Sequence, residues 1–165
     1  MRLPGCLRTA RFLLLPALLL LLAAPAPAQS QADINKVIGL MQADNYNFNN
    51  TRSPSVWTIH FAGSHLKDIK VVVAVGSGDE PAVIVFVTVT EKRRMPVTTD
   101  FMRTLLEEDH ELDRVKVAFD ADGDLEVRID AMLRVTDARE FENIVDQVKK
   151  SSDEIYGIIE PQLLN

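Results

Sequence analysis

The sequence is poor in the residues that usually mark a chemical site. Cysteine occurs once, at Cys6, and histidine only three times, at His60, His65 and His110. No two of these histidines have the i, i+4 spacing that places ligands on one helix face, and a zinc site needs three or four convergent ligands. We therefore predict no metal site and no bound cofactor.

The sequence also lacks the short motifs of common catalytic sites. It has no Gly-x-Ser-x-Gly elbow and no glycine-rich phosphate loop, and its single cysteine lies near the N-terminus. Carboxylates are plentiful, but their positions single out no catalytic pair. We predict that the protein is not an enzyme. An unrecognised hydrolase is the alternative, and it would need convergent polar groups in a pocket.

Positive charge is scarce, because 18 lysines and arginines stand against 24 aspartates and glutamates, for a net charge of −6. Three of the arginines and none of the acidic residues lie among the first 28 residues, so the rest of the chain carries −9. Nucleic-acid binding requires a basic face, and anionic membrane surfaces attract basic segments. No nucleic-acid partner is expected, and docking on an anionic membrane is disfavoured.

The first 28 residues resemble a secretory signal peptide. A basic segment precedes an apolar run over residues 12–22, and Ala26-Pro27-Ala28 supplies a small-residue cleavage site. The run is short for a membrane span of ~20 residues, and Cys6 precedes it instead of following it as in a lipoprotein. We predict cleavage after Ala28, a periplasmic or secreted location, and no membrane span thereafter. An uncleaved membrane anchor is the alternative.

Removing 28 of the 165 residues leaves 137 without a cysteine. An exported chain without disulfides must rely on its apolar core. A chain of this size can bury roughly two thirds of its unfolded surface, which is enough for such a core. We expect residues 29–165 to form a single domain.

The spacing of apolar residues predicts eight elements in the order α-β-β-β-α-β-β-α. Apolar positions at i, i+3, i+4 and i+7 indicate helices, and strict alternation indicates strands. Strands joined by short turns favour an antiparallel sheet, so the predicted fold class is α+β with helices packed against the sheet. The predicted elements are a helix over 31–44, strands over 55–62, 69–75 and 83–90, a helix from Thr98 or Thr99, strands over 114–119 and 125–131, and a long helix from Thr136-Asp137.

The register of the last two strands follows from residue types alone. A three-residue turn, Ala121-Asp122-Gly123, places Phe119 opposite Leu125, Val117 opposite Val127 and Val115 opposite Ile129. A turn one residue shorter or longer would place apolar side chains opposite charged ones, since side chains alternate faces along a strand. The acidic turn resembles a calcium loop, but its glycine is misplaced for an EF-hand. We therefore interpret it as a hairpin turn.

The strand over 83–90 is apolar on both faces for most of its length. Such a strand is either covered twice within the fold or lies at an interface. We predict candidate interface residues on this strand and on the last helix, namely Val83, Val85, Phe86, Val87, Ile155 and Ile159. A short basic run in an acidic chain is a second candidate, for docking an acidic partner segment or lipid headgroups, and comprises Lys92, Arg93 and Arg94.

The segments 101–106, 112–117, 120–125 and 141–156 are similar to the YbjN family of bacterial proteins, which resembles type III secretion chaperones in fold. The resemblance covers about Ala32 to Ile159. It implies an α+β domain that often self-associates, binds protein segments or acts in regulation, and has no catalytic residues.

Secretion chaperones act in the cytoplasm, whereas the N-terminal segment predicts export, so a binding role in the cell envelope is expected. We therefore predict an exported, non-enzymatic protein-interaction module of chaperone-like fold that binds a partner polypeptide or self-associates. The alternative is a small-ligand carrier of the bacterial envelope that uses a cavity between sheet and helices.

Overall fold

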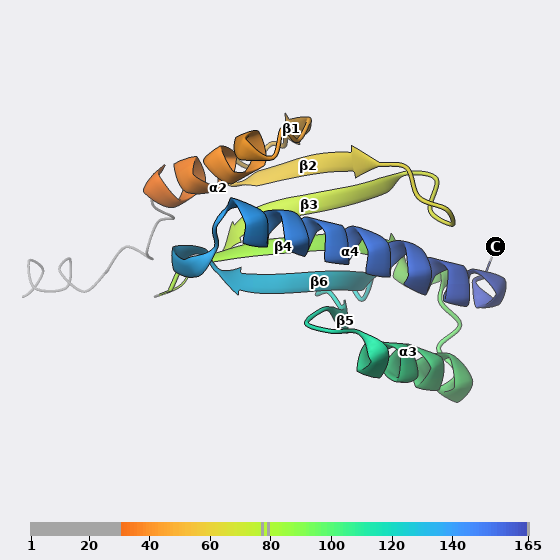
Figure 1. Ribbon diagram of the computed structural model, residues 1–165. Coiled ribbons are helices and arrows are strands. Elements are labelled where there is room, and N and C mark those ends of the chain that lie inside the picture. The colour runs from red at the N-terminus through yellow and green to blue at the C-terminus, as the bar shows by residue number, and fades with distance from the viewer. Residues whose placement is uncertain (1–30, 77, 79, 165) are drawn as a thin grey trace, which may run out of the picture.

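The structure, a computed structural model, describes residues 31–76, 78 and 80–164 (Figure 1). The predicted signal peptide lies outside the described residues. Every element predicted within them is present, and one short strand is additional. The helices are α2 (Gln31–Ala43), α3 (Thr99–Glu111) and α4 (Ala138–Ile159), and the strands are β1 (Phe48–Asn50), β2 (Val56–Phe61), β3 (Ile69–Gly76), β4 (Ala82–Thr90), β5 (Lys116–Phe119) and β6 (Leu125–Met132).

The six strands form one antiparallel sheet in the order β1-β2-β3-β4-β6-β5, which confirms the α+β class. Strand β1 lies between the predicted helix over 31–44 and the predicted strand over 55–62, where no element was predicted. Its three residues, two of them asparagine, are too few to show strand alternation. They become a strand because β2 offers a free edge, against which Phe48 is placed opposite Ile59.

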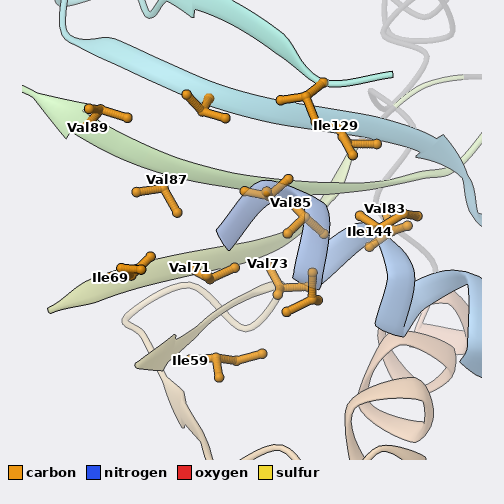
Figure 2. Packing of buried hydrophobic residues seen from close by; sticks show 14 of the residues in the cluster. Ile59, Ile69, Val71, Val73, Val83, Val85, Val87, Val89, Ile129 and Ile144 are labelled. Carbon is orange, nitrogen blue, oxygen red and sulfur yellow. The ribbon is translucent and has the colours of Figure 1, made fainter. Parts of the chain in front are cut away.

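Among the described residues, helices α2, α3 and α4 pack on one face of the sheet. Helix α4 contacts β3, β4 and β6, α2 contacts α4 and β3, and α3 contacts β5 and α4. Their buried side chains form one core cluster with alternate residues of the strands. Figure 2 shows this arrangement for β4, where Val83, Val85, Val87 and Val89 point toward the same core as Ile144 of α4.

Helix α4 begins where the sequence predicts. Asp137 is the N-cap, and its carboxylate accepts a hydrogen bond from the backbone N–H of Glu140 at 2.8 Å. Ser151 and Ser152 lie in the apolar stripe without interrupting it, since both are buried and the Ser152 hydroxyl donates to the carbonyl of Val148 at 2.6 Å. The α-helix ends at Ile159, and a 3-10 turn containing Pro161 follows, as the helix-breaking proline predicts.

The β5–β6 hairpin confirms the predicted turn and two of its three predicted pairs. Phe119 lies opposite Leu125 and Val117 opposite Val127. Gly123 closes the turn with a φ of 86°, which glycine adopts without strain. The third pair, Val115 with Ile129, does not form: Arg114 has a φ of 66°, so the chain turns there and β5 begins only at Lys116.

Candidate interaction surfaces

Five of the six predicted interface residues lie in the intramolecular core. Val83, Val85, Val87, Ile155 and Ile159 are all at most 2% exposed. In this conformation their side chains contact the protein itself and cannot reach a partner. Phe86 is the exception, because it points to the opposite face of β4 and is half-buried.

That opposite face of the sheet is covered by no helix among the described residues. One row of side chains crosses all six strands there, and the apolar members Val72 and Phe86 occupy its centre. Further apolar side chains flank the row on neighbouring strands. We call this the open face, and its apolar residues are Val56, Val72, Ala74, Ile84, Phe86 and Met132.

The β6–β5 side of the open face carries charges that are paired with one another. Arg128 donates to Asp130 at 2.7 Å and lies 3.6 Å from Glu126, and Lys116 reaches Asp130 at 3.3 Å. Desolvation by burial raises the pKa of Glu126, and Arg128 partly offsets this increase. This region therefore holds two cations and two anions in one internally compensated network.

A second apolar surface lies between α3 and the β5–β6 hairpin. Leu106 is 68% exposed and Phe119 45% exposed at this edge of the sheet, beside the half-buried Met102. The hollow between them holds about 50 Å³ and is lined mainly by apolar side chains. Ligand pockets usually measure about 300–1,000 Å³. We call this the α3 edge surface, and its size does not suit a small organic ligand.

The basic run forms a 3-10 turn, η1 (Lys92–Arg94), whose contacts are largely within the chain. The backbone N–H of Lys92 donates to the Asp124 carboxylate at 2.8 Å, and its side chain packs over Gly123 of the hairpin turn. Arg93 forms an ion pair with Glu91. The side chains of Lys92 and Arg93 are exposed. Docking of an acidic partner segment or lipid headgroups by this basic run therefore remains a prediction.

Besides Asp124, two further carboxylates near the β5–β6 hairpin accept backbone hydrogen bonds. Asp120 accepts from the N–H groups of Asp122 and Asp124 within the turn, at 2.9 and 2.8 Å, as expected for a hairpin and not for a calcium loop. Asp109 of α3 accepts from the N–H of Val117 at 2.8 Å, on β5 at the edge of the sheet. Both side chains therefore have structural roles.

Asp153 of α4 holds the loop between β2 and β3. Its carboxylate accepts hydrogen bonds from the N–H groups of Ser64, His65 and Leu66 at 2.7–2.8 Å. Desolvation by burial is the largest influence and raises the pKa of Asp153, but these three bonds together with nearby His65 outweigh it, so the pKa lies below its usual 3.8. The ring of His65 lies against Gly157, one helical turn further along α4.

Other histidine and aromatic side chains also have partners in the fold. His60 contacts Asp68 at 2.9 Å on the surface. Trp57 is buried, and Tyr46 packs edge-on against Phe61 and Phe141 with ring centroids 6.1 Å apart. Within the described part of the chain, no cluster of three or more potential metal ligands is found.

The helices of residues 31–76, 78 and 80–164 include none that is long and apolar enough to span a bilayer.

Comparisons with known proteins support the fold. No protein-family model and no curated protein matches the chain. The chain is similar to a chain in the structure of the heterodimeric ExoU–SpcU complex from the type III secretion system of Pseudomonas aeruginosa, with 15% identity, a TM-score of 0.53, and coverage of 74% of this chain and 97% of that one. A chain of the ExsC–ExsE complex gives 8% identity, a TM-score of 0.47, and coverage of 74% and 90%.

At 15% identity, the first similarity shows a shared fold and no more. It supports the type III secretion chaperone-like fold that the resemblance predicted. The second similarity is too weak to support an argument. Membership of the YbjN family remains a prediction.

Proposed function

We propose that this chain is an exported, non-enzymatic protein-interaction module of the YbjN family that binds polypeptides through the open face of its sheet. The observation that carries the proposal is the placement of all three described helices on one face of the sheet. The opposite face is left with an apolar centre on β2, β3 and β4 and on the end of β6. Contiguous apolar surface of this kind is typical of protein-binding sites.

The shape of the open face favours a polypeptide over a small ligand. Its residues follow the strands across a broad sheet, whereas small-molecule sites are concave and enclose most of their ligand. A partner that lies along β3 and β4 would remove Ile84 and Phe86 from water. At about 25 cal/mol per Å² of apolar surface, several half-buried side chains together provide useful binding energy. The carrier alternative has no comparable support, because the α3 edge hollow holds only about 50 Å³.

Three carboxylates of the chain have structural roles. Asp109, Asp120 and Asp153 each accept hydrogen bonds from backbone N–H groups. A general acid or base must reach a substrate proton, and these carboxylates are already used within the fold. This arrangement supports an interaction module.

Site-specific photo-cross-linking from the cell envelope tests the proposal. A benzoylphenylalanine replaces Phe86 on the open face and, as a matched control, Glu142 on the exposed side of α4. We expect a discrete protein adduct from position 86 and none from position 142, identified by mass spectrometry. Adducts from both positions, or from neither, would contradict a binding role for the open face.

A further inference from the structure

We infer that the polypeptide bound at the open face is an apolar segment that carries an acidic side chain, and that Lys70 on β3 binds this side chain. The inference rests on the proposed function and names the chemistry of its partner. It makes Lys70 a specificity-determining residue, because a charge selects one partner among several that are equally apolar. The evidence is the unpaired ammonium group of Lys70, its place beside the apolar centre, and the pairing of the other charges.

Lys70 is exposed, and among the described residues its ammonium group has no ion pair or hydrogen bond. It belongs to the open face because it lies two residues from Val72 on β3, and alternate residues of a strand share a face. Thr88 lies two residues beyond Phe86, which is opposite Val72, at the same end of the two strands. The exposed Thr88 hydroxyl has no hydrogen-bond partner in the described part of the chain either. An ammonium group and a hydroxyl on neighbouring strands can both donate to one carboxylate.

The charges on the β6–β5 side of the open face already have partners. Arg128 and Lys116 both contact Asp130, and Glu126 lies 3.6 Å from Arg128. Glu126 is opposite Thr88 on β6, but it is only 6% exposed. It therefore presents little negative charge to a segment that lies over Thr88. This network neither needs a charge from a partner nor offers one.

Lys70 therefore contributes the positive charge that is not balanced on the open face. The acidic residue nearest to it in sequence, Asp68, contacts His60 at 2.9 Å instead. The strands of the open face carry three lysine or arginine side chains and two carboxylates, although the whole chain has a net charge of −6. An acidic side chain of a partner is repelled by the acidic chain as a whole and is attracted at Lys70. A basic segment would be repelled at this position.

The apolar surface lies at a suitable distance from Lys70. Ile84 and Phe86 are half-buried and Met132 is 48% exposed, whereas Val72 is only 9% exposed and adds little contact area. Residues on one face of a strand follow one another at about 6.6 Å. An extended segment along β3 and β4 with its acidic residue over Lys70 would therefore place its next two side chains on the same face over the rows of Phe86 and Ile84.

Photo-cross-linking from position 86 tests the inference when Lys70 is varied in the same chain. Benzoylphenylalanine replaces Phe86, and the yield of the protein adduct from the cell envelope is compared among Lys70→Glu, Lys70→Arg and Lys150→Glu. Lys150 is exposed on α4, so Lys150→Glu changes the net charge equally and leaves the open face intact. We expect a yield about fivefold lower for Lys70→Glu, because like charges repel, and unchanged yields for Lys70→Arg and Lys150→Glu.

The adduct itself gives a second readout, which a purely structural role of Lys70 would not affect. Mass spectrometry should find an aspartate or glutamate close to the cross-linked residue of the partner. Replacing that acidic residue by lysine should restore the adduct in the Lys70→Glu chain, since the two charges are then exchanged. Circular dichroism and urea unfolding verify that all variants are folded.

The outcomes separate failure of the inference from failure of the proposed function. An unchanged yield for Lys70→Glu, an equal decrease for Lys70→Arg or Lys150→Glu, or no restoration by the exchanged charges would overturn the inference and leave the proposed function in place. A second copy of this chain in the adduct would do the same, and a lipid adduct would contradict both. If position 86 forms no adduct in the chain that keeps Lys70, the proposed function fails, and the inference fails with it.

Discussion

Gly63, near the start of the β2–β3 connection, has no room for a side chain. A Cβ there would lie 2.4 Å from an Asp153 carboxylate oxygen, 2.6 Å from the Leu66 carbonyl oxygen and 2.7 Å from Ile69. We expect Gly63→Ala to lower the free energy of unfolding by about 2 kcal/mol, because overpacking forces neighbouring atoms to shift.

Gly39 in α2 provides the matched control, since a Cβ there meets nothing within 4 Å. Gly39→Ala should raise the free energy of unfolding by up to about 1 kcal/mol through helix propensity. Urea unfolding at neutral pH measures both variants. If both substitutions changed the free energy of unfolding equally, the close contacts around Gly63 would not oppose a side chain at that position.

Asp153 should make the stability of the fold depend on pH. Its pKa in the folded state lies below 3.8, so its contribution is complete above the unfolded value of about 3.9 and is lost as the pH falls through the folded value. Asp153→Asn keeps one acceptor oxygen but removes the charge that strengthens three backbone hydrogen bonds. We expect it to cost about 1 kcal/mol at pH 7, with the difference from the wild type shrinking below pH 4.

Urea titrations at several pH values measure this difference, and Asp146→Asn on the exposed side of the same helix is the control. If the wild type stayed more stable than Asp153→Asn by the same amount down to acid pH, the effect would come from side-chain packing and not from the charge of Asp153.

Glu126 should show the opposite pH dependence. Desolvation by burial raises its pKa in the folded state, so ionisation at neutral pH costs stability, and the cost disappears below the unfolded pKa. Glu126→Gln should therefore stabilise the protein at pH 7 by up to about 1 kcal/mol, and the gain should vanish below about pH 4. Arg128 keeps its contact with Asp130 in this variant. A destabilised variant at pH 7 would mean that the Arg128 contact outweighs desolvation.

At the scale of elements, α3 protects an edge of the sheet. Strand β5 is an edge strand, and its Val117 N–H is taken by Asp109 of α3 at 2.8 Å. Exposed edge groups invite pairing with other chains. Asp109→Ala should expose this N–H, so we expect faster hydrogen exchange at Val117 and faster aggregation on mild heating.

Glu107→Ala, which removes the same charge from an exposed position of α3, is the control for Asp109→Ala. Exchange of the Val117 amide is followed by NMR, and aggregation by light scattering. If the two variants behave alike, net charge and not the edge contact governs aggregation.

The elements themselves could largely be predicted, because periodicity and capping are local. Asp137 and Thr98 cap their helices as predicted, and the hairpin turn fixes Val117 opposite Val127. Strand β1 could not be predicted, since its hydrogen bonds depend on the edge of β2. The late start of β5 depends on the backbone of Arg114. Its positive φ could not be predicted, because arginine is not a residue type that favours this conformation.

The candidate site could be predicted only in part, because alternation gives two faces without saying which one the helices cover. Val83, Val85 and Val87 share one face of β4, and Ile84 and Phe86 share the other. Both sets are apolar, so only the packing of α4 decides that the valines are buried. The candidate surface is therefore the face of β4 that carries Ile84 and Phe86. Its further members Val72 and Met132 could be recognised only through the strand pairing.

At the scale of the whole molecule, the predicted export would determine where the chain could meet a partner. We expect the protein isolated from the periplasm of a Gram-negative host to begin at Gln29, because Ala26 and Ala28 provide the small residues that signal peptidase requires. Replacing both alanines by phenylalanine should block cleavage and leave the full-length chain with the membrane fraction. Intact-mass measurement of the fractions separates the two products.

A chain that starts at Gln29 without the signal peptide is the control for export. It should remain in the cytoplasm and show the same circular dichroism and urea midpoint as the exported protein, because the described core begins only at Ile34 and a chain without cysteines after Cys6 needs no oxidising compartment to fold. A full-length wild-type chain in the cytoplasm would contradict export. The interaction surface would then have to be explained by cytoplasmic partners, and the cross-linking experiments at position 86 would have to be repeated in that compartment.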